Sequence, residues 1–237
     1  MHLPRPWPTR VRHALVRRLR ARGKLAFLKS LPEGAHVLDV GCGNHSPRDA
    51  KILRPDLVYH GLDIGDYNQE GSALYADEYV LTSPEQFAAE IGRWEGRMDA
   101  VVSSHNLEHC NEPEAVLRAM MRALKPGGRL FLAFPCEASV KFPSRRGSLN
   151  FFDDPTHRFM PSWTAVLEQL QSAGLQVELA CQRYRPRLLF TIGLVFEPIA
   201  RLTGRSVPGS ATWALYGFES IVWGRRTAHS SSQPLAR

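Results

Sequence analysis

The sequence lacks long apolar runs and has few cysteines. No uninterrupted apolar stretch reaches the roughly 18 residues that a membrane-spanning helix needs. Four cysteines are scattered along the chain without a C-x-x-C pair, at Cys42, Cys110, Cys136 and Cys181. This pattern implies neither a zinc site nor a disulfide framework, so we expect no bound metal and a reducing compartment. No secretory leader is recognisable at the start, and we therefore expect a cytoplasmic protein.

Acidic residues are absent from positions 1–32, which carry nine Lys and Arg residues. Positions 183–237 carry eight Lys and Arg residues against Glu197 and Glu219, so this flank is basic too. The middle of the chain is acidic, and the net charge of +7 therefore comes from the flanks. A nucleic-acid-binding protein would need its basic surface around the active-site face, and the chain has no RNA-binding motif. Nucleic acid is therefore disfavoured as a partner.

A chain of 237 residues is long enough for one domain with short appendages. We predict a basic helical arm over residues 1–32, a single domain over residues 33–226 and a disordered tail over residues 227–237. Apolar residues recur in the arm at helical spacing among arginines. Such a helix can cover a ligand cleft or lie on an anionic membrane. We favour the cleft, with peripheral membrane association as the alternative.

The most informative stretch is residues 36–44, with the sequence HVLDVGCGN. A short apolar run typical of a buried strand contains Asp39, and the chain then turns on Gly41 and Gly43. A second strand-like run ends in Asp63, 24 residues after Asp39. Nucleotide-binding βαβ units place a carboxylate that holds ribose hydroxyls at a spacing of roughly 20 residues. The two runs therefore predict a nucleotide site.

Two nucleotide chemistries use this layout. A dinucleotide site needs a third glycine where this chain has Ser46, and Asp39 would oppose a diphosphate. S-Adenosylmethionine carries an ammonium and a sulfonium but no phosphate, so a carboxylate suits it. The pattern therefore favours S-adenosylmethionine over a nicotinamide dinucleotide.

Two further blocks carry a family resemblance. Residues 98–109, MDAVVSSHNLEH, predict a strand and the loop after it, and residues 113–130 predict a helix, a KPGG turn and another strand. Together with the glycine pair and Asp63, they resemble the class I S-adenosylmethionine-dependent methyltransferases over about residues 33–182. The resemblance implies an α/β, Rossmann-like fold. Its mainly parallel seven-stranded sheet would have an antiparallel last strand and helices on both faces.

The resemblance also implies which residues contact S-adenosylmethionine. In open α/β sheets, ligands bind beyond the carboxyl ends of the strands. The predicted cofactor-binding residues are Asp39, Gly41, Cys42, Gly43, Asp63, Ile64, Ser104 and His105. No residue is assigned to the adenine amino group, because neither Asp77 nor Glu85 fits the usual position.

A long polar connection over residues 136–160 follows the predicted fifth strand and is expected to face the substrate. Its arginines suggest an acceptor with a carboxylate or phosphate, because a guanidinium can bind such groups through two hydrogen bonds. The candidate residues are Arg145, Arg146 and Arg158. His157 is the first candidate for a general base and His105 the second, since imidazole suits proton transfer at neutral pH. Either histidine could instead only order its loop.

An apolar helical insertion is predicted over residues 184–212, with Pro198 inside it. We favour a substrate lid or a dimer face for this insertion over membrane contact. Residues 214–223 are predicted as the last strand, and Ser83 as the cap of an earlier helix.

The leading function is an S-adenosylmethionine-dependent methyltransferase that acts on a small molecule or a glycan- or lipid-linked intermediate. Oxygen is the favoured acceptor atom. The alternative from another class is a non-catalytic S-adenosylmethionine-fold protein that binds a partner through its basic flanks. The intact glycine pair and the two strand-end carboxylates argue against that alternative. The acceptor's identity and the oligomeric state are left open.

Overall fold

The structure is a computed structural model that describes residues 20–43, 45–65, 75–207 and 210–227. Strands and helices largely alternate along this part of the chain. The elements are α2 (Lys24–Lys29), β1 (His36–Val40), α3 (Ser46–Leu53), β2 (Val58–Asp63), β3 (Glu78–Leu81), α5 (Phe87–Ile91), η1 (Gly92–Trp94), β4 (Met98–Ser104), η2 (Leu107–His109), α6 (Pro113–Ala123), β5 (Leu124–Pro135), η3 (Glu137–Lys141), η4 (Phe151–Asp153), α7 (Trp163–Ser172), β6 (Leu175–Cys181), α8 (Arg187–Thr203), α9 (Ala211–Tyr216) and β7 (Glu219–Arg226).

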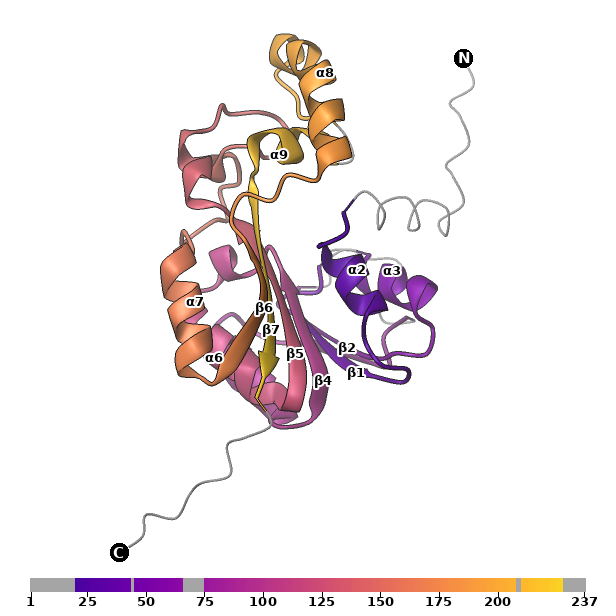
Figure 1. The fold of residues 1–237 in the computed structure, drawn as a ribbon. Coiled ribbons are helices and arrows are strands. Elements are labelled where there is room, and N and C mark those ends of the chain that lie inside the picture. Colours follow the sequence, from indigo (N-terminus) through magenta and orange to yellow (C-terminus); the bar gives the residue numbers. More distant parts are fainter. Residues whose placement is uncertain (1–19, 44, 66–74, 208–209, 228–237) are drawn as a thin grey trace, which may run out of the picture.

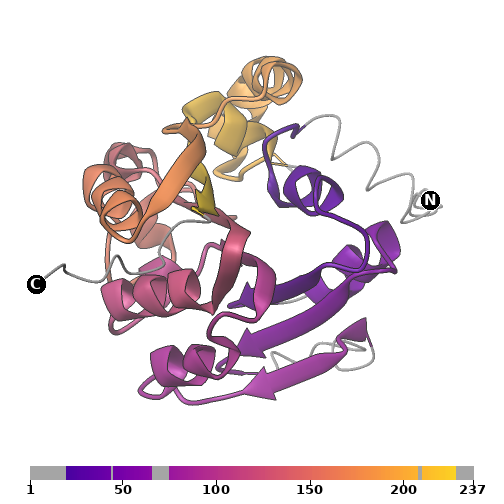
Figure 2. The same cartoon turned by 60° about the horizontal axis from the view of Figure 1, so that its bottom comes forward.

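Seven strands form one twisted sheet in the order β3-β2-β1-β4-β5-β7-β6 (Figure 2). β1 pairs in parallel with both β2 and β4, whereas β7 runs antiparallel to β5 and β6. Helices lie on both faces of the sheet (Figure 1). The predicted fold class is therefore confirmed, including the antiparallel last strand. The strand order reverses between β1 and β4, and ligands of open α/β sheets bind beyond the carboxyl ends of such a pair.

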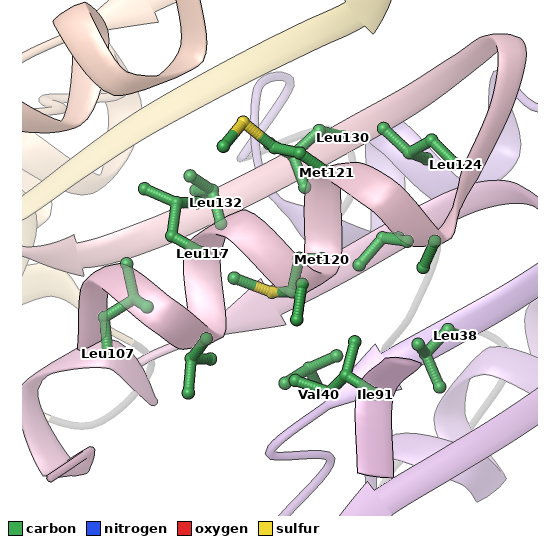
Figure 3. Close-up of a cluster of buried hydrophobic side chains, with 14 of the residues drawn as sticks. Leu38, Val40, Ile91, Leu107, Leu117, Met120, Met121, Leu124, Leu130 and Leu132 are labelled. Carbon is green, nitrogen blue, oxygen red and sulfur yellow. The ribbon is translucent and has the colours of Figure 1, made fainter. Parts of the chain in front are cut away.

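Successive side chains of the central strands point to opposite faces and build two cores. On one face, Leu38 of β1 packs in the same cluster as Met120 of α6, and Figure 3 shows leucines and methionines of β1, β5 and α6 meeting there. On the other face, Val37 and Phe131 pack with Phe27 of α2. A two-residue period with both faces buried is what a strand between two helical layers requires.

The structure differs from the predicted elements near the end of the chain. Residues 211–216 form α9, whereas the sequence predicts that the last strand already begins at residue 214. Gly217 ends this helix in the left-handed conformation, with a φ of 66°, and β7 begins only at Glu219. The apolar residues before Gly217 therefore bury one side of a helix.

Two smaller differences lie earlier in the chain. The helix expected from Ser83 begins at Phe87. The KPGG segment lies within the bounds of β5, although Gly127 has a φ of 79° and the pairing with β4 shifts its register there. The predicted arm up to residue 19 and the tail from residue 228 lie outside the described residues, so their structures stay predictions.

Helices α8 and α9 connect β6 to β7 beyond the carboxyl ends of the parallel strands (Figure 1). Gly193 lets the two helices approach closely, because a Cβ there would lie 2.3 Å from the carbonyl oxygen of Ala211. Glu197 is buried on α8 and accepts hydrogen bonds from Arg145 at 3.0 and 2.6 Å and from the Tyr216 hydroxyl at 2.6 Å. A buried ion pair thus holds α8 to the long connection after β5. No helix in the described part of the chain is long and apolar enough to cross a membrane.

We predict that Glu197→Gln lowers the free energy of unfolding at pH 7 by about 3 kcal/mol, because it leaves the buried guanidinium of Arg145 without a carboxylate. Burial alone would raise the pKa of Glu197, but hydrogen bonds from Arg145, Tyr216 and Arg201 bring it down to about 2. The stabilisation by Glu197 is therefore complete above pH 4.5 and is lost as the pH falls through about 2. Urea unfolding of both proteins at several pH values measures the difference.

The matched control is Glu168→Gln, which neutralises an exposed carboxylate on α7. Its free energy of unfolding is expected to stay within about 0.5 kcal/mol of the unchanged protein. Equal effects of the two substitutions would mean that the Glu197 ion pair does not hold α8 in place.

Candidate functional site

The glycine turn after β1 combines one tightly packed position with one open position. The backbone N–H groups of Gly41 and Cys42 donate to the carbonyl of Leu62 at 2.9 and 3.2 Å, which ties the turn to β2. Gly41 has a φ of 69°, and a Cβ on it would lie 2.3 Å from the side chain of Asn106. Gly43 has a φ of 53°, but among the described residues the nearest atom to a Cβ there, beyond its chain neighbours, is 3.9 Å away. Gly43 therefore borders open space into which a ligand can approach the backbone.

Asp63 closes the same turn from the end of β2. Its two carboxylate oxygens accept the N–H groups of Gly43 and Ile64, each at 2.7 Å, and the residue is only 4% exposed. Burial raises the pKa of the Asp63 carboxyl, and these backbone hydrogen bonds oppose that shift. Each oxygen keeps acceptor capacity for a further donor, such as a ligand hydroxyl.

Asp39 is fully buried in the middle of the turn's supporting strand. Its Oδ2 accepts from the Lys24 ammonium, the Tyr59 hydroxyl and the Ser46 hydroxyl, the last at 2.7 Å. Its Oδ1 is buried and has no hydrogen-bond partner within the described residues. From the sequence, this carboxylate is expected to suit the cofactor's ammonium, whereas in the structure it already pairs with the ammonium of Lys24. Direct contact between Asp39 and the cofactor stays a prediction, with Oδ1 as the remaining acceptor.

A cavity of about 150 Å³ opens beside the carboxyl ends of β2 and β4, and we call it the cofactor-side cavity. Its wall includes Ile64, Pro84, Glu85, Phe87, Ala88, Asn106, His109, Cys110, Asn111, Glu112 and Val116. Ile64 is 44% exposed, so an apolar side chain is available to a planar ring. Cys42 is buried, and its Sγ would lie 3.3 Å from a Cβ on Gly61, so its thiol packs against β2. Any contact between Cys42 and a ligand would therefore go through the backbone.

His105 directly follows β4, and its imidazole lies between two carboxylates. Its Nδ1 lies 3.2 Å from Glu108 Oε1 and its Nε2 lies 3.2 Å from Glu219 Oε1. Burial alone would lower the pKa of His105, but these two carboxylates raise it to about 9. The ring is therefore a cation at neutral pH that donates through both nitrogens. Such a ring has no lone pair to accept a proton, so this geometry does not support His105 as a general base. The predicted cofactor residue Ser104 is half-buried at the end of β4, and its contact with the cofactor stays a prediction.

The segment that precedes α2 lies against the same carboxylate. Glu219 also pairs with Arg20, and the backbone N–H of Arg22 donates to the Tyr184 hydroxyl at 3.2 Å. Burial alone would raise the pKa of Glu219, but Arg20 and His105 bring it down to about 2. Arg20 and His105 are thus two cations that share one buried carboxylate at the start of β7.

His157 lies in a second imidazole–carboxylate cluster on the other side of Glu108. Atoms of Glu108, His109 and His157 that could bind a ligand all lie within 4.8 Å of one another. His157 Nδ1 lies 2.5 Å from the Phe151 carbonyl oxygen, so Nδ1 carries the proton and Nε2 the lone pair. Glu108 is buried, and its Oε2 has no hydrogen-bond partner within the described residues. The structure thus brings together three residues where the sequence analysis expects no metal ligands.

The three predicted substrate arginines lie in different environments. Arg145 is 6% exposed and directs its guanidinium to Glu197, so it is not free to clamp an acceptor. Arg146 and Arg158 are exposed, and Arg158 donates to the Asn111 side chain at 2.8 Å. The role predicted for Arg145 is therefore at odds with its ion pair, and the roles of the other two stay predictions.

A family model described as a methyltransferase domain matches residues 11–180, well over half of the chain. This chain belongs to the methyltransferase domain family. It is 37% identical over 192 residues to a ubiquinone biosynthesis O-methyltransferase of Xanthomonas axonopodis pv. citri, an alignment that covers 74% of this chain and 73% of the relative.

Solved structures of low identity share the fold. A methyltransferase solved in complex with the Haloferax volcanii Trm112 activator superposes with a TM-score of 0.62 at 17% identity, covering 92% of this chain and 94% of the other. An S-adenosylmethionine-dependent methyltransferase from Archaeoglobus fulgidus gives a TM-score of 0.52 at 16% identity, covering 92% and 95%.

The protein is thus an S-adenosylmethionine-dependent methyltransferase of small molecules. The site fits this cofactor on three observations: the open space beside Gly43, the acceptor capacity of Asp63 and the apolar Ile64 at the cavity wall. The methyl group of the bound cofactor is a strong electrophile, so the protein has mainly to orient the acceptor and manage its proton. The alternative of a non-catalytic binding protein is set aside because the family is one of enzymes.

Several residues of the site are not predicted from the sequence. Asn106 contacts the glycine turn and lines the cofactor-side cavity, and its position just after β4 is the signal that could reveal it. Glu108 and Glu219 are assigned no role from the sequence, since their approach to His105 depends on strand pairing. Glu85 lines the cavity and is thus a candidate for the adenine amino group that the sequence leaves unassigned.

We predict that Asp63→Ala weakens S-adenosylmethionine binding by about 1.5–3 kcal/mol, the usual contribution of a hydrogen bond to a charged group. The fold should survive, because the lost hydrogen bonds lie at one turn on the cleft side. Isothermal titration calorimetry measures the affinity, and unchanged affinity would remove Asp63 from the site.

A paired glycine experiment separates ligand contact from backbone strain. Gly43 and Gly34 both have positive φ values with free space around a Cβ, but only Gly43 lies at the cofactor turn. Gly43→Ala and Gly34→Ala should therefore each cost about 1 kcal/mol of stability. Only Gly43→Ala is expected to weaken cofactor binding, by about tenfold or more. If Gly34→Ala weakens binding as much, the effect comes from the backbone and not from the site.

Proposed function

We propose that the protein transfers a methyl group to a hydroxyl oxygen of a small acceptor with an aromatic or otherwise apolar body. The observation that carries this proposal is the Nε2 of His157, which lies 4.0 Å from the Asp154 carboxylate and belongs to the cluster with the buried Glu108. An imidazole nitrogen beside carboxylates is the arrangement of a general base. Oxygen acceptors need such a base because a hydroxyl must lose its proton as it attacks. The relative from Xanthomonas is named an O-methyltransferase, which supports the same acceptor atom.

The acceptor side of the site is lined by residues around His105. Arg20, Tyr184, Pro186, Leu189, Ser210, Trp213, Ala214 and Glu219 border a narrow space that we call the acceptor-side cavity. The His105 ring packs against Trp213, with centroids 5.1 Å apart, and lies nearly parallel to Phe218. Only about 10 Å³ is open, and Arg20 lies in its wall, so an acceptor of any size must displace some of these side chains. Aromatic walls favour a flat or apolar acceptor.

In the proposed reaction, the two histidines have different roles. His105 is held as a cation between Glu108 and Glu219, where it orients the carboxylates and adds positive charge near the acceptor. His157 directs its Nδ1 at the Phe151 carbonyl, so Nε2 is the nitrogen that would take a proton. The unpartnered Oε2 of Glu108 would then stabilise the imidazolium that forms. An anionic group on the acceptor would find the exposed Arg146 and Arg158.

The same cluster has a second candidate role. Glu108, His109 and His157 offer a carboxylate oxygen and two imidazole nitrogens, which is a common ligand set for a divalent cation. The orphaned Oε2 of Glu108 favours this role, since a buried carboxylate oxygen usually has a partner. The Thr156 hydroxyl and carbonyl lie 3.0 and 3.3 Å from His109 Nδ1 and would orient that ring for binding.

We predict that His157→Ala lowers kcat by roughly 10²- to 10⁴-fold and leaves the affinity for S-adenosylmethionine nearly unchanged. The matched control is His60→Ala, which removes an imidazole that pairs with Glu78 away from the cleft. The pH profile of kcat should lose one ionisation in His157→Ala only. A loss of thermal stability with an unaltered pH profile would mean that His157 only orders its loop.

Chelation separates the two roles of the cluster. If His157 acts as the base, methyl transfer is unchanged after treatment with EDTA and dialysis. Activity that disappears on chelation and returns with Mg²⁺ or Zn²⁺ would instead assign Glu108, His109 and His157 to a cation.

A further inference from the structure

The outward side of α8 is largely apolar, although Thr191 and Arg201 are exposed on this helix as well. Of the eleven large hydrophobic residues that are exposed in the described part of the chain, six lie on this helix. They are Leu188, Leu194, Val195, Phe196, Ile199 and Leu202, and we call them the outer face of α8. Leu202 is 89% exposed and Val195 66%. Soluble proteins rarely keep so many large apolar side chains together in water.

This exposure is not the result of a loosely attached helix. The opposite stripe of α8, formed by Leu189, Gly193, Glu197 and Ala200, is buried. Gly193 lies against the backbone of α9, and Glu197 is bonded to Arg145 and Tyr216. Turning the outer face inward would break the buried ion pair and separate the close helix contact. The structure therefore fixes the outer face away from the rest of the protein. Figure 1 shows α8 at the upper end of the molecule.

The charges around the outer face have one sign. Between positions 183 and 207 the charged residues are Arg183, Arg185, Arg187, Arg201, Arg205 and one acid, Glu197. Glu197 is buried and accepts a hydrogen bond from Arg201 at 2.9 Å as well as from Arg145, and all five arginines are exposed. At the far end of the helix, Arg146 is also exposed and bridges to Arg205 through the backbone. Both ends of the apolar face thus carry positive charge.

We propose that the outer face of α8 docks the enzyme onto an anionic lipid surface, with the helix axis in the plane of the interface. An apolar stripe enters the boundary between headgroups and acyl chains, and the arginines at its ends bind lipid phosphates. Arginine suits this role because its guanidinium can donate two hydrogen bonds to one phosphate.

The charge distribution around the outer face of α8 favours a membrane over a second copy of the chain as its binding partner. In a two-fold dimer the same patch occupies both sides of the interface. Two outer faces of α8 would therefore bring arginines against arginines in either helix direction, without an exposed acid in this segment to compensate. An anionic surface complements the patch at both ends.

The docking surface lies on the acceptor side of the enzyme. Pro186 and Leu189, at the start of α8, line the acceptor-side cavity from the inner side of the same helix. A docked bilayer would therefore lie at the end of the molecule where the acceptor enters. The inference itself does not depend on which atom is methylated, since it rests on exposure and charge alone.

Vesicle flotation of the full chain tests the docking surface. The probes are vesicles of phosphatidylcholine alone and of phosphatidylcholine with about one quarter phosphatidylglycerol. We expect binding to the anionic vesicles that weakens in about 0.5 M NaCl, because salt screens the arginines. Val195→Asp with Ile199→Asp should reduce the bound fraction at least about tenfold, and Val195→Ser with Ile199→Ser should reduce it less. The control Gln171→Asp adds an acid to an exposed position of α7 and should bind like the unchanged protein.

Cofactor affinity and thermal stability of each variant show whether it is folded, since neither position touches the site. The proposal is overturned if the unchanged protein does not float with anionic vesicles, or if the Asp variants float equally well. It is also overturned if sedimentation shows a dimer that the Asp variants dissociate, because the outer face would then bind a second copy. Equal binding to neutral and anionic vesicles would contradict the role of the arginines.

Discussion

The buried carboxylate of Asp39 is the interaction on which the site depends. It lies in the central strand β1 with no exposure to solvent, and it accepts hydrogen bonds from Lys24 of α2, Ser46 of α3 and Tyr59 of β2. A buried charge without partners is strongly destabilising. The carboxylate therefore fixes β2, α2 and α3 relative to β1. The glycine turn begins only two residues later, at Gly41. The geometry that shapes the cofactor side of the site is thus part of what holds this end of the fold together.

Buried charges also meet at the carboxyl end of β4 and the start of β7. Glu108 and Glu219 are buried acids, and the imidazolium of His105 lies between them while Arg20 reaches Glu219 from outside the sheet. The positive charges of His105 and Arg20 balance the negative charges of Glu108 and Glu219. The acceptor side can therefore exclude water without leaving a buried charge unpaired. Because His105 stays protonated in this arrangement, the Nε2 of His157 is the proton acceptor in the proposed reaction.

The strands around the site could be predicted from the sequence because their side chains carry local signals. Residues 36–40 form an apolar run that ends in a glycine turn, and the observed β1 has these bounds. The ion pairs could not be predicted, since Arg145 and Glu197 are 52 positions apart and meet only through the packing of α8 on α9. For the same reason the sequence predicts a substrate clamp at Arg145. It also assigns residues 214–216 to the last strand, because the contact of α9 with Gly193 is not a local signal.

The central claim is that the turn between β1 and α3 binds S-adenosylmethionine, and calorimetry of the full chain with two ligands tests it most directly. Titration with S-adenosylmethionine should give saturable binding of one molecule per chain, and titration with NAD under the same conditions should give none. The account is contradicted if NAD binds and S-adenosylmethionine does not, because Asp39 and Ser46 would then have failed to exclude a diphosphate.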